Sequence, residues 1–276
     1  MIEIPEAFVL AKQAEQSLIG KQVSTVIPLH SPHKFAWFSG DPQRYNEYLS
    51  GKTITGAEAR AGQLEIMLED FSMVFSDGVN LRFHPDDMGI PEKHQLLIKF
   101  QDKTALSASI AMYGGILCSP IGENDNPYYL TARNKPSPLT SIFDLPYFLN
   151  LFSTSSKKLS LKAFLATEQR IPGLGNGVLQ DILFHAGDHP KRKLVDLDEA
   201  EIQQLFHAVK TTLREMAESG GRDTENDLFG KPGRYITQMS KNTVGRPCPN
   251  CGQTIQKEAY LGGSIYYCSS CQKLKN

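Results

Sequence analysis

The chain of 276 residues has only five cysteines, a single tryptophan and no long apolar run. It contains no stretch of about eighteen consecutive apolar residues, which argues against a membrane-spanning helix. The opening Met-Ile-Glu-Ile-Pro-Glu lacks the basic region and apolar core of a signal peptide. No Ser/His/Asp set, Walker loop or dinucleotide-binding glycine motif is visible. These absences argue against membrane proteins, triad hydrolases and common nucleotide-binding enzymes, and they predict a cytoplasmic protein.

Four of the five cysteines form two Cys-x-x-Cys pairs near the C-terminus, separated by sixteen residues. This spacing is typical of a site in which four thiolates bind one zinc ion, here Cys248, Cys251, Cys268 and Cys271. Gly262-Gly263 predicts a hairpin turn between the pairs, with Thr254–Ile255 and Ile265–Tyr267 as short strands. Two disulfides are the alternative, which we disfavour because nothing else in the sequence is typical of a secreted protein.

The predicted zinc ion is structural, because four thiolates leave no coordination position for water. A ribbon of this size has no core of its own, so the metal would hold it folded. We therefore expect one zinc ion per chain, and catalysis elsewhere. The fifth cysteine, Cys118, lies in the apolar segment Gly-Gly-Ile-Leu-Cys-Ser and is expected to be a buried, unreactive thiol.

The net charge of −1 is unevenly distributed along the chain. Residues 1–150 carry 12 basic and 17 acidic side chains, whereas residues 151–276 carry 17 basic and 13 acidic ones. The half that contains the cysteine pairs is therefore the basic one. Such a distribution is compatible with a C-terminal part that faces phosphate groups.

The first part of the chain is predicted to be a helix followed by strands. Residues 5–19 favour a helix, because Pro5 suits its first turn and Leu10, Ala14 and Leu18 recur on one face. Residues 22–130 alternate short strand patterns with turn residues, which is typical of a β-sandwich or barrel. The expected strands are Val23–Ile27, Leu64–Leu68, Leu81–Phe83, Leu96–Phe100 and Ala105–Ala111, with a break at Ser76-Asp77-Gly78.

A polar, proline-bearing linker at residues 131–140 is predicted to precede a helical part. A helix capped by Ser156 or Ser160 is expected to reach Arg170, and a second helix to follow and to end at Gly187. A third is expected over residues 198–218. The class is therefore α+β, with domains predicted at residues 1–132, 133–230 and 245–276.

The order of these parts resembles the formamidopyrimidine-DNA glycosylase/endonuclease VIII family of base-excision repair enzymes. The resemblance rests on the opening Glu3-Ile-Pro-Glu6, the break Pro-Gly-Leu-Gly-Asn176 between two helices, Gly187-Asp-His-Pro190, Gly230-Lys-Pro-Gly233 and the cysteine ribbon. It covers nearly the whole chain. It implies an N-terminal β-sandwich, a helix–two-turn–helix domain and a zinc finger, with DNA as the partner.

The departures from the family concern the groups that perform its chemistry. Family members use the amine of an N-terminal proline to attack the sugar, and Ile2 stands at that place here. The bulk of Ile2 is expected to leave Met1 attached. The family's strand lysine falls at Gly62, and the arginine of its zinc hairpin falls at Gly263. The resemblance therefore implies that the amine-dependent lyase step is lost.

Two acidic side chains and one helix start are retained. The residue that matches Glu3 is a general acid or base in the family; the alternative for Glu3 is an exposed carboxylate favoured by the helix dipole. Glu6 is a second catalytic candidate, with helix capping as its alternative. Backbone N–H groups around Gly175 and Asn176 suit a DNA phosphate. The alternative is that they only end one helix and begin the next.

The segment His30–Phe38 combines two histidines, a lysine and the only tryptophan with two phenylalanines. Basic and aromatic side chains together suit stacking on bases beside phosphate, so His33 and Lys34 are candidate DNA-binding residues. Tyr113 is another, because it is the only aromatic residue where the family's intercalating segment falls. The alternative is a surface loop whose aromatic side chains point into the core.

Two functional classes remain open from the sequence. The first is a DNA glycosylase that hydrolyses the bond between a damaged or modified base and its sugar, with Glu3 activating water. The second is a catalytically silent protein that recognises distorted or modified DNA. A third possibility, in which the Met1 amine is the nucleophile, requires a displacement of about 3.5 Å along the chain. We expect a monomer that is associated with the nucleoid when bound to DNA, with no membrane partner.

Overall fold

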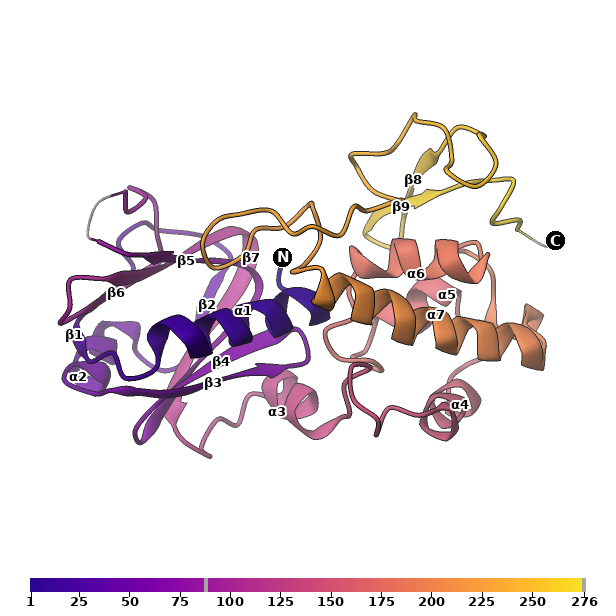
Figure 1. The fold of residues 1–276 in the computed structure, drawn as a ribbon. Coiled ribbons are helices and arrows are strands. Elements are labelled where there is room, and N and C mark those ends of the chain that lie inside the picture. The colour runs from indigo at the N-terminus through magenta and orange to yellow at the C-terminus, as the bar shows by residue number, and fades with distance from the viewer. Residues whose placement is uncertain (87–88, 275–276) are drawn as a thin grey trace. The chain divides into compact units, whose positions relative to one another are not determined.

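The structure is a computed structural model that describes residues 1–86 and 89–274. The chain forms two compact units (Figure 1). The first comprises Met1–Arg133 together with Glu225–Gly233, and the second comprises Asn134–Thr224 and Arg234–Asn276. The first boundary lies inside the polar linker expected from the sequence. The order of the predicted elements along the chain does not indicate that residues 225–233 belong to the first unit.

The first unit begins with helix α1 (Ile4–Leu18), as predicted. Its buried face includes Ala7, Leu10, Ala14 and Leu18, which recur at helical spacing. This face lies against strands β3 (Ile54–Arg60) and β4 (Gln63–Leu68) (Figure 1). Gly20 follows the helix with a φ of 81°, a left-handed conformation that glycine adopts without steric cost.

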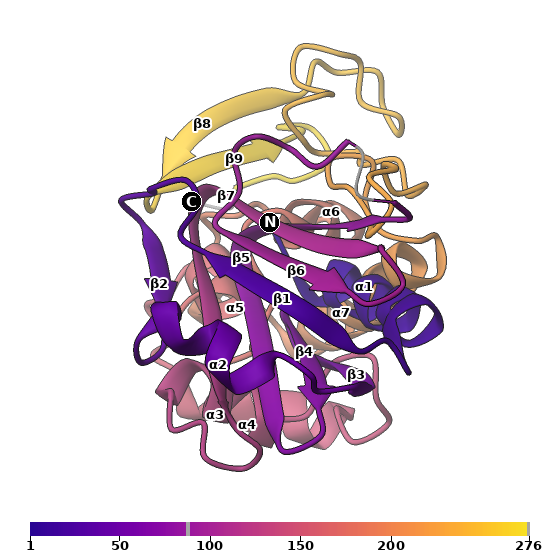
Figure 2. The same ribbon diagram turned by 90° about the vertical axis from the view of Figure 1, so that its left-hand side faces the viewer.

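A seven-stranded sheet is the largest part of this unit (Figure 2). The strand order is β1-β6-β7-β5-β4-β3, and β2 pairs with β7 in parallel. The strands are β1 (Val23–Pro28), β2 (Ala36–Phe38), β3 (Ile54–Arg60), β4 (Gln63–Leu68), β5 (Phe71–His84), β6 (Leu96–Phe100) and β7 (Ala105–Pro120). A 3-10 turn (Pro42–Arg44) and helix α2 (Tyr45–Leu49) follow β2.

The expected break at Ser76-Asp77-Gly78 is wrong, because β5 continues through these residues with a bulge between Asp77 and Val79. Asp77 has a φ of 58°, and a Cβ on Gly78 would lie 2.5 Å from the Tyr113 carbonyl oxygen. Only glycine allows β7 to approach this closely. The bulge lets two long strands bend together instead of ending.

The bend divides the sheet into the two layers expected of a sandwich. Residues 71–77 of β5 pair with residues 114–120 of β7, and β4 and β3 extend this layer. Residues 79–84 of β5 pair with residues 105–110 of β7, and β6 and β1 extend the other. Buried side chains from both layers and from α1 form one core, which includes Leu10, Leu64, Phe75, Leu106 and Ile116.

The second unit is helical, with α4 (Leu145–Thr154), α5 (Leu161–Ala166), α6 (Val178–Ala186) and α7 (Glu199–Glu218); α3 (Pro127–Asn134) crosses the boundary between the units. Ser160 caps α5, as expected, by accepting the Ala163 N–H at 3.2 Å. The helix ends at Ala166 rather than at Arg170, because Glu168 and Gln169 adopt positive φ angles. Helix α7 begins at the predicted cap, Asp198.

The cysteine ribbon belongs to the second unit. Its hairpin consists of β8 (Gln256–Tyr260) and β9 (Gly263–Tyr267), joined by the expected glycine turn. The first strand starts two residues later than predicted, since Thr254 instead forms an isolated bridge with Pro247. Within the part of the chain that the structure describes, no helix has the length and apolar character needed to span a membrane.

Candidate functional site

The four paired cysteines converge on one point. Their sulfur atoms all lie within 4.8 Å of one another, with Cys248 Sγ 3.8 Å from Cys271 Sγ and Cys251 Sγ 3.4 Å from Cys268 Sγ. A tetrahedral zinc site with Zn–S bonds of about 2.3 Å has edges of about 3.8 Å. These separations far exceed a disulfide bond of about 2.05 Å. The residues therefore fit the zinc site that the spacing predicts.

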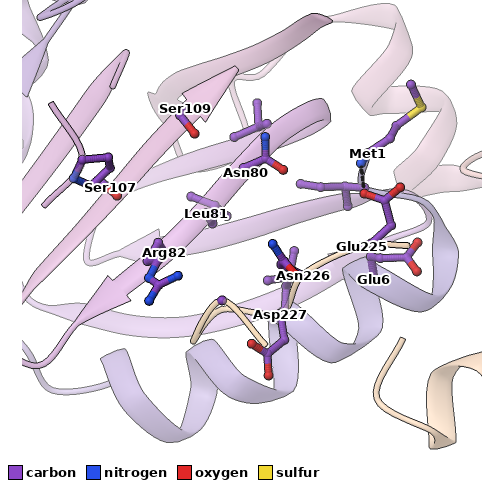
Figure 3. A pocket seen from close by; sticks show the side chains of 15 residues that line it. Met1, Glu6, Asn80, Leu81, Arg82, Ser107, Ser109, Glu225, Asn226 and Asp227 are labelled. Carbon is purple, nitrogen blue, oxygen red and sulfur yellow. Dashed lines mark hydrogen bonds and ion pairs between the residues drawn. The ribbon is translucent and has the colours of Figure 1, made fainter. Parts of the chain in front are cut away.

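A small cavity of about 130 Å³ lies beside the N-terminus in the first unit (Figure 3). Polar side chains from several elements surround it: Glu6 on α1, Asn80 and Arg82 on β5, Ser107 and Ser109 on β7, and Asn226. Its volume is below the roughly 300 Å³ of ordinary ligand clefts. The cavity therefore suits one small polar group, such as a single base.

The loop of residues 225–233 closes one side of this cavity and is fastened to the unit by specific contacts. The Met1 amine forms an ion pair with Glu225 (Figure 3). Gln13 on α1 donates to Asp227 Oδ2 at 2.9 Å and accepts the Leu228 N–H at 2.9 Å. These contacts explain why the loop joins the first unit.

Glu3 and Glu6 lie at the start of α1, and both are buried. The Glu3 N–H donates to Glu6 Oε2 at 3.3 Å within a capping box, so Glu6 does cap the helix and also lines the cavity. Glu3 is only 3% exposed, so the alternative of an exposed carboxylate is wrong. The Ile2 N–H donates to the Asp77 carbonyl at 2.5 Å, which ties the N-terminus to the bulge of β5.

Asp77 is a candidate acid that sequence reasoning missed. Ser76 Oγ donates to its Oδ2 at 3.0 Å, and the Tyr128 hydroxyl donates to its Oδ1 at 3.4 Å. Burial raises the pKa of the Asp77 carboxyl above its ordinary value. Burial and the charges of Asp77 and Glu3 raise the pKa of Tyr113. Ser-Asp-Gly is a common turn sequence, so the sequence predicts an exposed Asp77. Only the pairing of β5 with β7 shows that this residue is part of a strand.

Exposed aromatic and apolar side chains gather where β2 pairs with β7. The Tyr113 ring lies 5.9 Å from the Trp37 ring, and Phe35, Trp37 and Met112 are exposed. The alternative that the aromatic residues of this segment fill the core is therefore wrong for Phe35 and Trp37. Lys34 is exposed beside Phe35, whereas His33 lines a different cavity with His30 and Glu92.

In the second unit, Asn176 lies against the tip of the ribbon hairpin. Asn176 Nδ2 donates to the Ser264 carbonyl at 3.0 Å, and the buried Lys162 donates to the Tyr260 carbonyl at 2.6 Å. A Cβ on Gly263 would lie 3.3 Å from Lys162 Nζ and 3.5 Å from the Asn176 side chain. Burial lowers the pKa of Lys162. Lys162 therefore places an amine beside the glycine at which the family's arginine falls. Sequence reasoning missed this residue.

The remaining predicted positions are also located. Gly175 precedes Asn176 before α6, where its carbonyl accepts the Leu179 N–H at 3.3 Å. Gly62 lies in the turn between β3 and β4. The nearby Arg60 forms ion pairs with Glu58 and Glu65 at 2.6 and 2.8 Å. Cys118 is buried as expected, and burial raises its pKa to about 12.

Comparisons with known proteins match this architecture. Residues 135–227 match the family described as "Formamidopyrimidine-DNA glycosylase H2TH domain". The chain is 27% identical to the formamidopyrimidine-DNA glycosylase of Enterococcus faecalis, over 100% of this chain and 98% of that protein. It is 28% identical to that of Nitrosococcus oceani, over 99% and 100%.

Solved structures share the fold. The MutM (Fpg) protein of Thermus thermophilus is similar with a TM-score of 0.81 and 22% identity, covering 99% of this chain and 100% of that one. Lactococcus lactis Fpg, in a complex with DNA that contains an abasic site, gives a TM-score of 0.82 at 22% identity, covering 98% and 99%.

Proposed function

The chain belongs to the formamidopyrimidine-DNA glycosylase/endonuclease VIII family, and from this premise we propose that it binds damaged DNA and releases a modified base by hydrolysis. The observation that carries the proposal is the buried Glu3 carboxylate at the start of α1. Glu6, in the first turn of the same helix, lines the small polar cavity. A second reading, a silent protein that binds distorted DNA, is supported by Ile2 at the place of the proline amine.

The proposed chemistry uses two carboxyl groups with different surroundings. Glu3 would activate a water molecule or stabilise positive charge that develops on the sugar as the base leaves. Asp77 is better suited to hold a proton, because burial raises its pKa. In the cavity, Asn80, Ser107 and Ser109 offer hydrogen bonds to the edge of a base.

DNA contacts are proposed for both units separately. In the first unit, Trp37 and Tyr113 provide surfaces on which bases can stack, with Lys34 and His33 nearby in sequence. In the second unit, Asn176 and the N–H groups around Gly175 suit a phosphate at the start of α6, and Lys162 supplies positive charge. We propose that zinc at the four cysteines holds the hairpin that supports Asn176 and Lys162.

We expect base release to depend on Glu3. Incubation with duplexes and single strands that carry different damaged bases should free one class of base, and Glu3→Gln should reduce that release at least about a hundredfold, a typical contribution of general acid–base catalysis. Chromatography of the freed base measures the rate. Glu15→Gln, on the exposed side of the same helix, is the matched control and should keep the wild-type rate. DNA binding without any base release would favour the silent protein.

We expect DNA affinity to fall steeply with salt, because each neutralised phosphate contributes about −0.9 to the log–log slope. Asn176→Ala should weaken binding by about 1 kcal/mol, the free energy of one hydrogen bond. Lys162→Met should weaken DNA binding and make the log–log salt slope shallower by about 0.9, the contribution of one phosphate contact. Fluorescence anisotropy at several salt concentrations measures both.

Lys210→Met is the control for Lys162→Met. Like Lys162, Lys210 donates to backbone carbonyls, here those of Thr140 and Phe143, but neither of these hydrogen bonds involves the ribbon hairpin or Asn176. This variant should leave the slope unchanged. Equal slopes for both lysine variants would contradict the proposed phosphate contact.

A further inference from the structure

A second cavity of about 260 Å³ lies on the other side of the β5 bulge. Its polar and aromatic side chains come from three strands, from helix α3 and from the residue before this helix: Trp37, Gln63, Ser76, Asp77, Tyr128 and Asn126. It shares no lining residue with the cavity around Met1. We propose that this second cavity binds a nucleobase that carries an exocyclic amine.

The first reason is a buried acceptor that lacks a donor. Gln63, the first residue of β4, is only 2% exposed and lines the cavity. Its Oε1 accepts no hydrogen bond from any described residue. Burying such an oxygen unpaired destabilises a protein, so a site that retains one is suited to a ligand that brings an N–H group.

The neighbouring polar groups define which edge of a ligand fits. Asp77 adds a carboxyl group, whose Oδ1 receives only a long 3.4 Å hydrogen bond from the Tyr128 hydroxyl and remains an acceptor when the group holds a proton. Asn126 Oδ1 already accepts the N–H groups of Tyr128 and Tyr129, at 2.9 and 3.2 Å, which leaves the Asn126 amide nitrogen as a donor. Two acceptors and one donor match an edge on which an amine stands beside a ring nitrogen or carbonyl.

The second reason is the aromatic wall. Trp37 lines the cavity and is 52% exposed, an unusual exposure for tryptophan, and Leu117 adds an apolar surface. The indole ring therefore offers a stacking surface at the mouth of a cavity whose interior is polar. Stacking on an aromatic ring combined with hydrogen bonds to one edge is how proteins hold a single unpaired base.

Trp37 also makes the test specific, because it is the only tryptophan of the chain and gives one indole N–H signal in a ¹⁵N–¹H spectrum. Cytidine should shift this signal with a saturable dose dependence. Uridine, which replaces the amine by a carbonyl, should bind at least about tenfold more weakly. Equal shifts with both nucleosides would overturn the proposal.

Gln63→Met is the decisive variant, since methionine has a similar length but no acceptor. It should raise the Kd for cytidine at least about fivefold while the melting temperature stays the same or rises, because an unpaired buried oxygen is removed. A melting temperature that falls would indicate damage to the fold, and Asp77→Asn is then measured in the same way. Glu15→Gln, on the exposed side of α1, is the control and should leave the Kd unchanged.

The base can come from a free nucleoside or from a DNA strand. To separate these sources, the same titration is repeated with a short oligocytidylate and with an oligothymidylate. A selective shift with the oligonucleotide alone, lost in Gln63→Met, supports the proposal with DNA as the source. No selective shift with either form overturns it. Anisotropy of a labelled duplex reports DNA binding independently of Trp37, so failure of this inference and failure of the proposed function give different results.

Discussion

Cys248→Ser is expected to lose the zinc ion that we propose for the ribbon and to unfold the ribbon, while the helices of the second unit remain folded. The four sulfur atoms lie within 4.8 Å of one another, and the free energy with which zinc binds such a site is about 10–16 kcal/mol. The hairpin between the pairs carries the Tyr260 and Ser264 carbonyls that hold Lys162 and Asn176. Loss of zinc should therefore also lower DNA affinity by about tenfold or more.

Elemental analysis and thiol titration measure this effect. The wild-type protein should contain one zinc ion per chain, and strong chelators should expose four additional reactive thiols. Cys118→Ser is the matched control, because Cys118 is buried in the other unit and lies outside the cysteine cluster. It should retain zinc and DNA affinity. Wild-type protein without zinc, or Cys248→Ser with full zinc content and DNA affinity, would contradict the prediction.

The second prediction is that this protein does not cleave DNA strands at abasic sites. An imine with the opened sugar requires an uncharged amine at the sugar carbon. Ile2 stands where the family has its proline, and the Met1 amine is held in an ion pair with Glu225. Among the described residues, no lysine lines the cavity beside Met1 or the cavity that contains Gln63. Arg60 is not a substitute, because a guanidinium stays protonated.

Borohydride trapping with abasic DNA should therefore yield no covalent adduct, and cleavage should proceed at the rate measured in buffer. The expected difference from an active enzyme is large, since enzymes accelerate their reactions by about a millionfold or more. An active family member serves as the positive control for the assay. Efficient trapping by this protein would contradict the prediction. Peptide mapping of the adduct would then identify the amine as that of Met1 or of a lysine such as Lys34.

Local sequence signals determined much of the fold. The buried faces and ends of α1 and α7 follow from apolar spacing, from Pro5 and from the cap at Asp198. The four cysteines and the glycine turn of the hairpin follow from spacing alone. Each of these features depends on residues that are close in the chain, where backbone conformation and side-chain periodicity decide the outcome. The catalytic and DNA-binding roles of individual residues stay predictions.

Only the tertiary structure decided the surroundings of the candidate site. Ser76-Asp77-Gly78 has the composition of a turn, yet it continues a strand because β7 pairs with both of its sides. Residues 225–233 return to the first unit because Gln13 and Met1 bind them from more than 200 positions away. The surroundings of Gln63, whose Oε1 accepts no hydrogen bond from the described residues, likewise include Trp37 and Tyr128 from distant elements. Such contacts depend on how separate elements pack, and local propensity carries no information about them.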